Sequence, residues 1–278
     1  MLHASVALGA AHSSAMLLSR VITALCLAAF ALAGIFLLPT WGFALVFGLA
    51  AGAGVYEWSG FLRAPTRAVR IAYVAIYAVL IGFIFVNEWL YGRIIQTVGV
   101  LWLGVIVLVL AYPRGRGLYT RSWLIGLVGQ LVMVGAWSSL MAIRELPFGE
   151  YWLVWLLVLT TATDVGAFFT GRALGRRKLA PSLSPGKTWE GAFGGLLLAL
   201  SICLVALLVF SEWSLFNALI LTIGLIVIAI FGDLFESLLK RATGLKDSGG
   251  LLPGHGGVLD RIDSIIAASP LLAWGLLG

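Results

Sequence analysis

The sequence is poor in charge. Only 11% of its 278 residues are Asp, Glu, Lys or Arg, whereas soluble domains contain roughly 25%, and 61% are hydrophobic. This composition excludes a water-soluble globule and an intrinsically disordered chain. Cysteine is also scarce. Cys26 and Cys203 both lie in apolar runs, where they are expected to be buried, so a disulfide scaffold or a cysteine metal site is excluded.

Long apolar runs are abundant instead. About 17–25 apolar residues cross the hydrocarbon core of a membrane as a helix, and nine runs approach or reach this length. They cover residues 21–38, 41–56, 69–86, 94–112, 122–142, 151–170, 191–211, 214–232 and 262–278. The first resembles a signal peptide after Arg20, but the eight runs behind it favour a retained helix. The sequence therefore predicts an all-α, polytopic integral membrane protein with about nine transmembrane helices.

The positive charges indicate the orientation of these helices. Nine spans place the two termini on opposite sides of the membrane. Of the 18 Lys and Arg residues, 16 then fall on the side of the N-terminus, and only Arg93 and Arg144 fall on the other. Because cytoplasmic loops carry an excess of Lys and Arg, the N-terminus is predicted to be cytoplasmic. The expected location is a bacterial inner membrane.

The aspartates are concentrated in the second half of the chain, since all five lie at or after Asp164. Residues 1–150 are therefore expected to form a scaffold of about five helices. Residues 151–278 are expected to form a catalytic region of about four helices, with long cytoplasmic loops at 171–190 and 233–261. Glycine pairs at Gly48/Gly52 and Gly191/Gly195 are expected to allow close helix packing within the chain rather than dimerisation.

Three aspartates lie at the predicted cytoplasmic edge of the membrane. Asp233 ends the eighth apolar run, and Asp260 and Asp263 open the ninth, where their spacing places them on one helix face. Several carboxylates beside an aqueous loop favour a divalent cation, and oxygen ligands alone favour Mg²⁺. The alternative is that Asp260 and Asp263 lie at a helix N-terminus and pair with nearby arginines, which needs no metal.

Cations lie among glycines around these acids. Lys240, Arg241 and Lys246 precede a glycine-rich stretch, and Ser184 and Lys187 belong to a Ser-Pro-Gly-Lys turn before the seventh run. Glycines let backbone N–H groups turn toward an anion, and Lys and Arg supply the counter-charge. The alternative is that these cations only set the topology and attract lipid headgroups.

These motifs resemble the signature of the phosphatidate cytidylyltransferases, also called CDP-diacylglycerol synthases. Residues 237–263 read SLLKRATGLKDSGGLLPGHGGVLDRID and fit that signature throughout. Residues 164–172, DVGAFFTGR, and 183–191, LSPGKTWEG, also resemble the family, although Gly186 stands where the family often has a second lysine. The resemblance covers about residues 160–265.

The resemblance implies an enzyme that converts CTP and phosphatidate to CDP-diacylglycerol and pyrophosphate, the first committed nucleotide step of phospholipid synthesis. It implies Mg²⁺, leaves room for a second, monovalent cation, and suggests a homodimer without nucleic acid. The implied catalytic residues are Asp260, Lys240 and Arg241, and the implied metal ligands are Asp233, Asp260 and Asp263. The implied contacts to CTP or lipid phosphate are Ser184, Lys187, Lys246, Asp247 and His255, with Asp164 in a supporting role.

Two alternatives differ from this interpretation. A carboxylate inside an apolar run, such as Asp164, is typical of ion-coupled transporters. Transporters usually contain repeated halves with matching broken helices, and the sequence shows no such pairing. Within enzymes, a cytidylyltransferase for another lipid phosphate stays open, whereas the aspartate motif of the CDP-alcohol phosphotransferases is missing.

Overall fold

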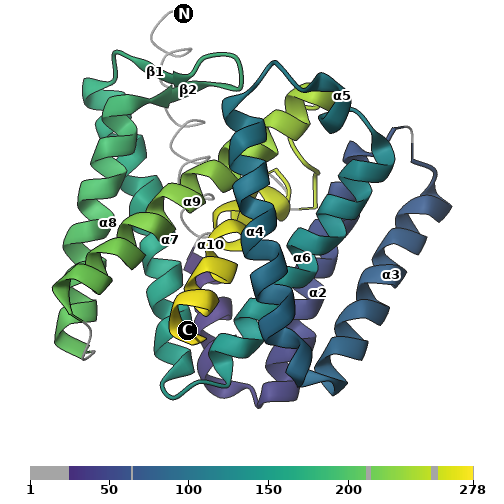
Figure 1. Ribbon diagram of the computed structural model, residues 1–278, viewed down its shortest axis with the longest axis horizontal. Helices are drawn as coiled ribbons and strands as arrows, with labels where there is room; N and C mark the ends of the chain where they lie inside the picture. Colours follow the sequence, from purple (N-terminus) through teal and green to yellow (C-terminus); the bar gives the residue numbers. More distant parts are fainter. Residues whose placement is uncertain (1–24, 64, 211–213, 252–255, 278) are drawn as a thin grey trace, which may run out of the picture.

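Helices running roughly side by side form the body of the protein (Figure 1). The computed structural model describes residues 25–63, 65–210, 214–251 and 256–277. Its helices are Leu25–Leu37, α2 (Thr40–Trp58), α3 (Arg67–Val86), α4 (Tyr91–Leu110), α5 (Arg116–Tyr119), α6 (Ser122–Arg144), α7 (Gly149–Leu174), α8 (Trp189–Phe210), α9 (Leu215–Thr243) and α10 (Leu259–Leu277), with short 3-10 turns at Ser59–Phe61 and Glu88–Leu90. The predicted all-α class is confirmed, apart from one small hairpin.

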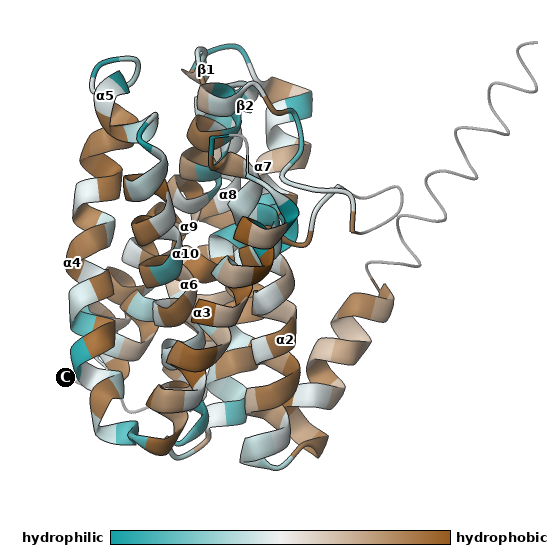
Figure 2. Cartoon of the chain, turned by 90° about the vertical axis from the view of Figure 1, so that its right-hand side faces the viewer, coloured by the Kyte–Doolittle hydropathy of each residue, from teal (hydrophilic) through white to brown (hydrophobic). Residues whose placement is uncertain are grey.

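Within the described residues, six helices are long and apolar enough to cross a membrane: α3, α4 with its preceding turn, α6, α7, α8 and α9. Hydrophobic residues predominate along these helices (Figure 2), and many of their large hydrophobic side chains are exposed, as expected in contact with lipid. The protein is therefore an integral membrane protein. Three further apolar helices are not among these six. Leu25–Leu37 is short, α2 carries Glu57, and α10 carries three charged residues near its start. The number of nine spans stays a prediction.

The α9 helix is longer than the sequence predicts. The apolar run ends at residue 232, but the helix continues to Thr243 because hydrophobic side chains keep one of its faces buried. These buried side chains are Leu234, Phe235, Leu238 and Leu239. The helix ends at Gly244, whose φ of 74° is the left-handed conformation that glycine adopts without strain. Asp233, Lys240 and Arg241 therefore lie on a helix, and the prediction of a loop from 233 is wrong.

The predicted loop 171–190 contains a β-hairpin. The α7 helix reaches Leu174, and β1 (Lys178–Ala180) then pairs with β2 (Ser184–Thr188) in an antiparallel register that joins Ala180 to Ser184. The carboxylate of Glu190 accepts hydrogen bonds from the backbone N–H groups of Arg176 and Arg177 at 3.1–3.3 Å. These bonds fix the base of the hairpin against the start of α8.

Close packing of α7 against α8 depends on glycine. A Cβ atom at Gly195 would lie 2.5 Å from the Thr163 carbonyl oxygen, and one at Gly191 would lie 2.9 Å from that of Ala167. This pair therefore packs within the chain, as predicted. Gly48 also faces its own chain, since its Cβ would lie 3.1 Å from Ile81 on α3.

The two cysteines have different environments. Cys203 is buried, as expected. Cys26 is exposed, so its predicted burial is wrong. The reason is that most side chains of Leu25–Leu37 are exposed, because this helix packs against the bundle along one side only.

The last helix occupies the middle of the bundle. In Figure 1, α10 lies among the other helices, and it packs against α9, α6, α4, α7 and α2. Its start is therefore surrounded by elements from both halves of the chain. The division into regions 1–150 and 151–278 stays a prediction.

Candidate active site

Asp260 joins three elements in the first turn of α10. Its Oδ1 accepts a hydrogen bond from the Lys240 ammonium of α9 at 2.7 Å. Its Oδ2 accepts from the Ser248 hydroxyl at 2.9 Å and from the Gly257 N–H at 2.8 Å. The carboxylate thus links the end of α9, α10 and the glycine-rich loop that joins them (residues 244–258, of which 252–255 lie outside the described residues). The sequence predicted Asp260 and Lys240 as site residues, and the fold brings them into contact.

The environment of Asp260 keeps it ionised. Asp260 precedes the apolar run 262–278, and partial burial alone would raise its pKa. The hydrogen bonds from Lys240, Gly257 and Ser248 and the charge of Lys240 outweigh burial and lower the pKa to about 2. A full negative charge therefore faces Lys240 at neutral pH.

Lys240 contacts a second carboxylate. Glu236, one turn earlier on α9, places Oε2 3.3 Å from the Lys240 ammonium. The Glu236 side chain is almost fully buried, and its Oε1 has no hydrogen-bond partner among the described residues. Buried carboxylate oxygens normally have partners, and Oε1 of Glu236 departs from this rule. Glu236 was not among the predicted site residues, and its position four residues before Lys240 was the available signal.

A second ion pair joins the hairpin to α9. The Lys187 ammonium on β2 contacts Oδ2 of Asp233, and each side chain is about one-third exposed or less. Asp164 on α7 lies within electrostatic range of both. The two predicted polar segments thus meet at this pair.

The acids near this pair have the donor chemistry of an Mg²⁺ site. Asp263 lies within electrostatic range of Asp233, Glu236 and Asp164, and all of these offer oxygen ligands. In the described part of the chain, no three His, Cys, Asp or Glu side chains converge closely enough to hold a metal ion. Lys187 and Lys240 contact Asp233 and Asp260 instead. The donor set fits the predicted metal, and the metal itself stays a prediction.

Three other predicted residues, Arg241, Lys246 and Asp247, lie at or just after the end of α9. The Arg241 Nε donates to the Leu183 carbonyl at 3.1 Å, which ties α9 to the hairpin turn just before Ser184. Lys246 and Asp247 are exposed on the loop after α9. His255 lies outside the described residues.

Glu57, the first acidic residue of the chain, was not among the predicted site residues. It lies near the end of α2, is 3% exposed, and accepts a hydrogen bond from the Leu259 N–H at 2.8 Å. Gly249 and Gly257 pack directly on its carboxylate, where an added Cβ would lie 2.3 and 2.4 Å from its oxygens. Glu57 therefore positions the glycine-rich loop. A lone carboxylate at the end of an apolar run was the available signal.

Replacing Glu57 tests this positioning role. Glu57→Ala should lower stability by about 1–3 kcal/mol, because it leaves the buried Leu259 N–H without an acceptor. Glu57→Gln should lose less, because its amide oxygen can accept the same bond. Thermal unfolding in detergent measures the difference, with exposed Glu88→Ala as the matched control. Equal melting temperatures for Glu57→Ala and Glu88→Ala would contradict the role.

Comparison with known proteins identifies the class. Residues 18–276 match the model of the cytidylyltransferase family. The chain therefore belongs to that family, and it is a membrane-embedded nucleotidyltransferase. This confirms the resemblance of the sequence motifs and favours an enzyme over an ion-coupled transporter.

Several bacterial proteins are similar along almost their full length. The phosphatidate cytidylyltransferase of Pseudomonas aeruginosa is 42% identical over 262 residues, which cover 93% of this chain and 96% of that protein. The phosphatidate cytidylyltransferase of Haemophilus influenzae is 35% identical over an alignment of 287 positions, which covers 93% of this chain and 98% of that protein. That of Brucella suis is 37% identical over 262 residues, with 91% of each covered.

Proposed function

We propose that this protein transfers the cytidylyl group of CTP to phosphatidate and so forms CDP-diacylglycerol and pyrophosphate. The observation that carries the proposal is Lys240, held by Asp260 and Glu236 beside the glycine-rich loop. This cluster lies between a membrane bundle and its polar loops, where a water-soluble nucleotide and a membrane lipid can meet. The names of the similar bacterial proteins support the same reaction.

The chemistry requires charge neutralisation more than a strong base. A phosphate oxygen of phosphatidate attacks the α-phosphorus of CTP and forms a new P–O bond. The bond from that phosphorus to the bridging oxygen of the β-phosphate breaks, and its electron pair leaves with pyrophosphate. A phosphate monoester has a second pKa of about 6, so the nucleophile is largely ionised at neutral pH. Lys187, Lys240 and Arg241 offset the negative charge of the phosphates.

Asp233, Asp260 and Asp263 are the proposed Mg²⁺ ligands, and Glu236 adds the unpaired oxygen beside them. When bound, Mg²⁺ supplies positive charge to the phosphate oxygens and fixes their orientation. Ser184 shapes the hairpin turn, while Lys246, Asp247 and His255 contact nucleotide or order the loop. Asp164 is proposed to support the site by adding a second negative charge near the Lys187 ammonium.

The site end of the bundle is proposed to face the cytoplasm of a bacterial cell, across its inner membrane. The hairpin, α5 and the end of α9 lie at one end of the molecule in Figure 1, and α10 ends at the other. Most Lys and Arg residues belong to segments at the first end, which supports this orientation. A homodimer is the proposed assembly.

Transfer of radiolabel tests the reaction. Purified protein in detergent is given α-³²P-CTP, phosphatidate and Mg²⁺, and label in the organic extract is counted. We expect labelled lipid only when both phosphatidate and Mg²⁺ are present, and its loss on chelation with EDTA. Label that requires a different lipid phosphate would support the alternative substrate. No label with any lipid phosphate would contradict the proposed function.

A further inference from the structure

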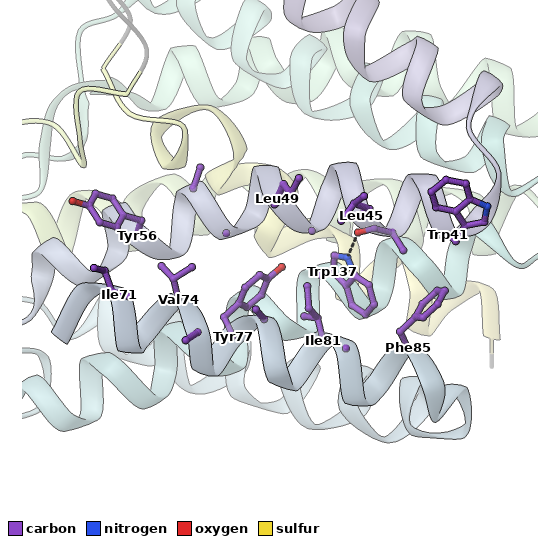
Figure 3. Close-up of a pocket in the computed structure, with 17 residues that line it drawn as sticks. Trp41, Leu45, Leu49, Tyr56, Ile71, Val74, Tyr77, Ile81, Phe85 and Trp137 are labelled. Atoms are coloured by element: carbon purple, nitrogen blue, oxygen red, sulfur yellow. Dashed lines mark hydrogen bonds between the residues drawn. The ribbon is translucent and has the colours of Figure 1, made fainter. Parts of the chain in front are cut away.

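A long apolar groove runs between α2 and α3 (Figure 3). Its volume is about 880 Å³, within the range of small-molecule sites. It extends from Trp41 and Phe85 at one end to Tyr56 and Ile71 at the other. Small residues on both helices leave the space open, namely Gly48, Gly52 and Ala53 on α2 and Ala75, Ala78 and Gly82 on α3.

We propose that this groove binds an acyl chain of the lipid substrate, an inference that rests on the proposed function. From Trp41 to Tyr56 the helix rises by about 22 Å, at 1.5 Å per residue. One leaflet occupies about half of the ~30 Å hydrocarbon core, so the groove is long enough for a chain that enters from that leaflet. The apolar lining excludes a charged ligand from its interior.

The Tyr56 end of the groove leads to the active site. The Arg70 guanidinium lies 5.5 Å from the centre of the Tyr56 ring. A Cβ atom at Gly60 would lie 4.0 Å from both Arg70 and the Ser248 carbonyl, so the cation and the glycine-rich loop flank the same point. Ser248 in turn binds Asp260. A phosphatidate molecule whose acyl chain lies in the groove therefore presents its phosphate to the positive charge of Arg70 beside the loop.

Tyr77 of α3 is a lining residue of the groove that carries a hydroxyl group. Its side chain is 1% exposed and its hydroxyl has no hydrogen-bond partner in the described part of the chain. Figure 3 shows Tyr77 among the lining residues, opposite the α2 segment between Leu49 and Tyr56. That segment lies within about two helical turns, or 11 Å, of the phosphate end. The ester carbonyls of a glycerolipid lie just below its phosphate and offer the acceptor that this hydroxyl needs, whereas a purely apolar occupant does not.

Filling the groove tests the proposal. Gly52→Leu and Ala78→Leu each place a bulky side chain in the groove. The matched control is Gly104→Leu. Gly104 is exposed on α4, and a Cβ atom added there would have no other atom within 4 Å. KM is measured in mixed micelles for dioleoyl and for dihexanoyl phosphatidate. In the filled variants, the KM for dioleoyl phosphatidate divided by the KM for dihexanoyl phosphatidate should rise about tenfold. Loss of the burial of roughly two methylene groups corresponds to this factor. The control should keep the wild-type ratio.

Tyr77→Phe separates a specific site from general lipid contact. This variant should raise KM for ester-linked dioleoyl phosphatidate, and it should leave KM for the corresponding ether-linked lipid at its wild-type value. Equal effects on both lipids would contradict the hydrogen bond to an ester carbonyl.

The remaining outcomes are distinct. An unchanged KM ratio in the filled variants overturns the acyl-chain site. If the filled variants keep the wild-type KM ratio but elute as monomers in size-exclusion chromatography while the wild-type protein elutes as a dimer, the groove is a contact between two copies of the chain. If the wild-type protein converts neither phosphatidate, the proposed function itself fails, and the groove loses its substrate.

Discussion

Asp260→Asn is expected to lower the rate of cytidylyl transfer by at least ~100-fold, equivalent to about 2.7 kcal/mol of transition-state stabilisation. Both carboxylate oxygens act as acceptors, one for Lys240 and one for Ser248 and Gly257. The amide of Asn has only one oxygen. Its NH₂ group must therefore face either the Lys240 ammonium or the donors on Ser248 and Gly257. Lys240 also loses one of its two anionic partners, and a buried charge without its partner is costly.

The measurement is label transfer from α-³²P-CTP, performed with saturating phosphatidate and Mg²⁺. The control is Glu145→Gln, which removes an exposed carboxylate at the opposite end of the bundle and should keep wild-type turnover. Size-exclusion chromatography and the thermal unfolding curve show whether Asp260→Asn is folded. A folded Asp260→Asn protein with wild-type turnover would exclude Asp260 from the reaction.

Lys187→Met is expected to lower the same rate by about 100–1,000-fold, the range associated with removal of one preorganised electrostatic group from an active site. Its ammonium contacts Asp233, whose neighbours within electrostatic range include the carboxylates of Asp164 and Asp263. Without this cation, like charges face one another and the phosphates lose a counter-charge. Lys187→Arg should recover part of the rate, because it restores the positive charge.

Lys178→Met is the matched control, since Lys178 is an exposed lysine on the other strand of the same hairpin. It should retain the wild-type rate. If both methionine variants lose the same activity, the effect belongs to the hairpin as a whole and not to the charge beside Asp233. The dependence of the rate on Mg²⁺ concentration adds an independent readout, because a purely structural role of Lys187 would not change it.

The arrangement of the site was only partly predictable. Lys240 and Glu236 are four residues apart on one helix, so local geometry brings them together. The contact between Glu57 and Leu259 spans 202 residues, and helical periodicity carries no information on such a pair. The β-hairpin was unexpected because a five-residue strand beginning with Ser-Pro-Gly has no alternating pattern of apolar residues.

Some properties of this protein follow from the sequence alone. Low charge and long apolar runs require helices, since backbone groups in a membrane must satisfy their hydrogen bonds within the segment. The family follows as well, because its polar motifs are contiguous in the chain. The tertiary structure decided which charges meet. It placed α10 in the middle of the bundle, paired Lys187 with Asp233 and left a groove between α2 and α3. Such contacts depend on helix packing, which the shapes of many side chains determine together.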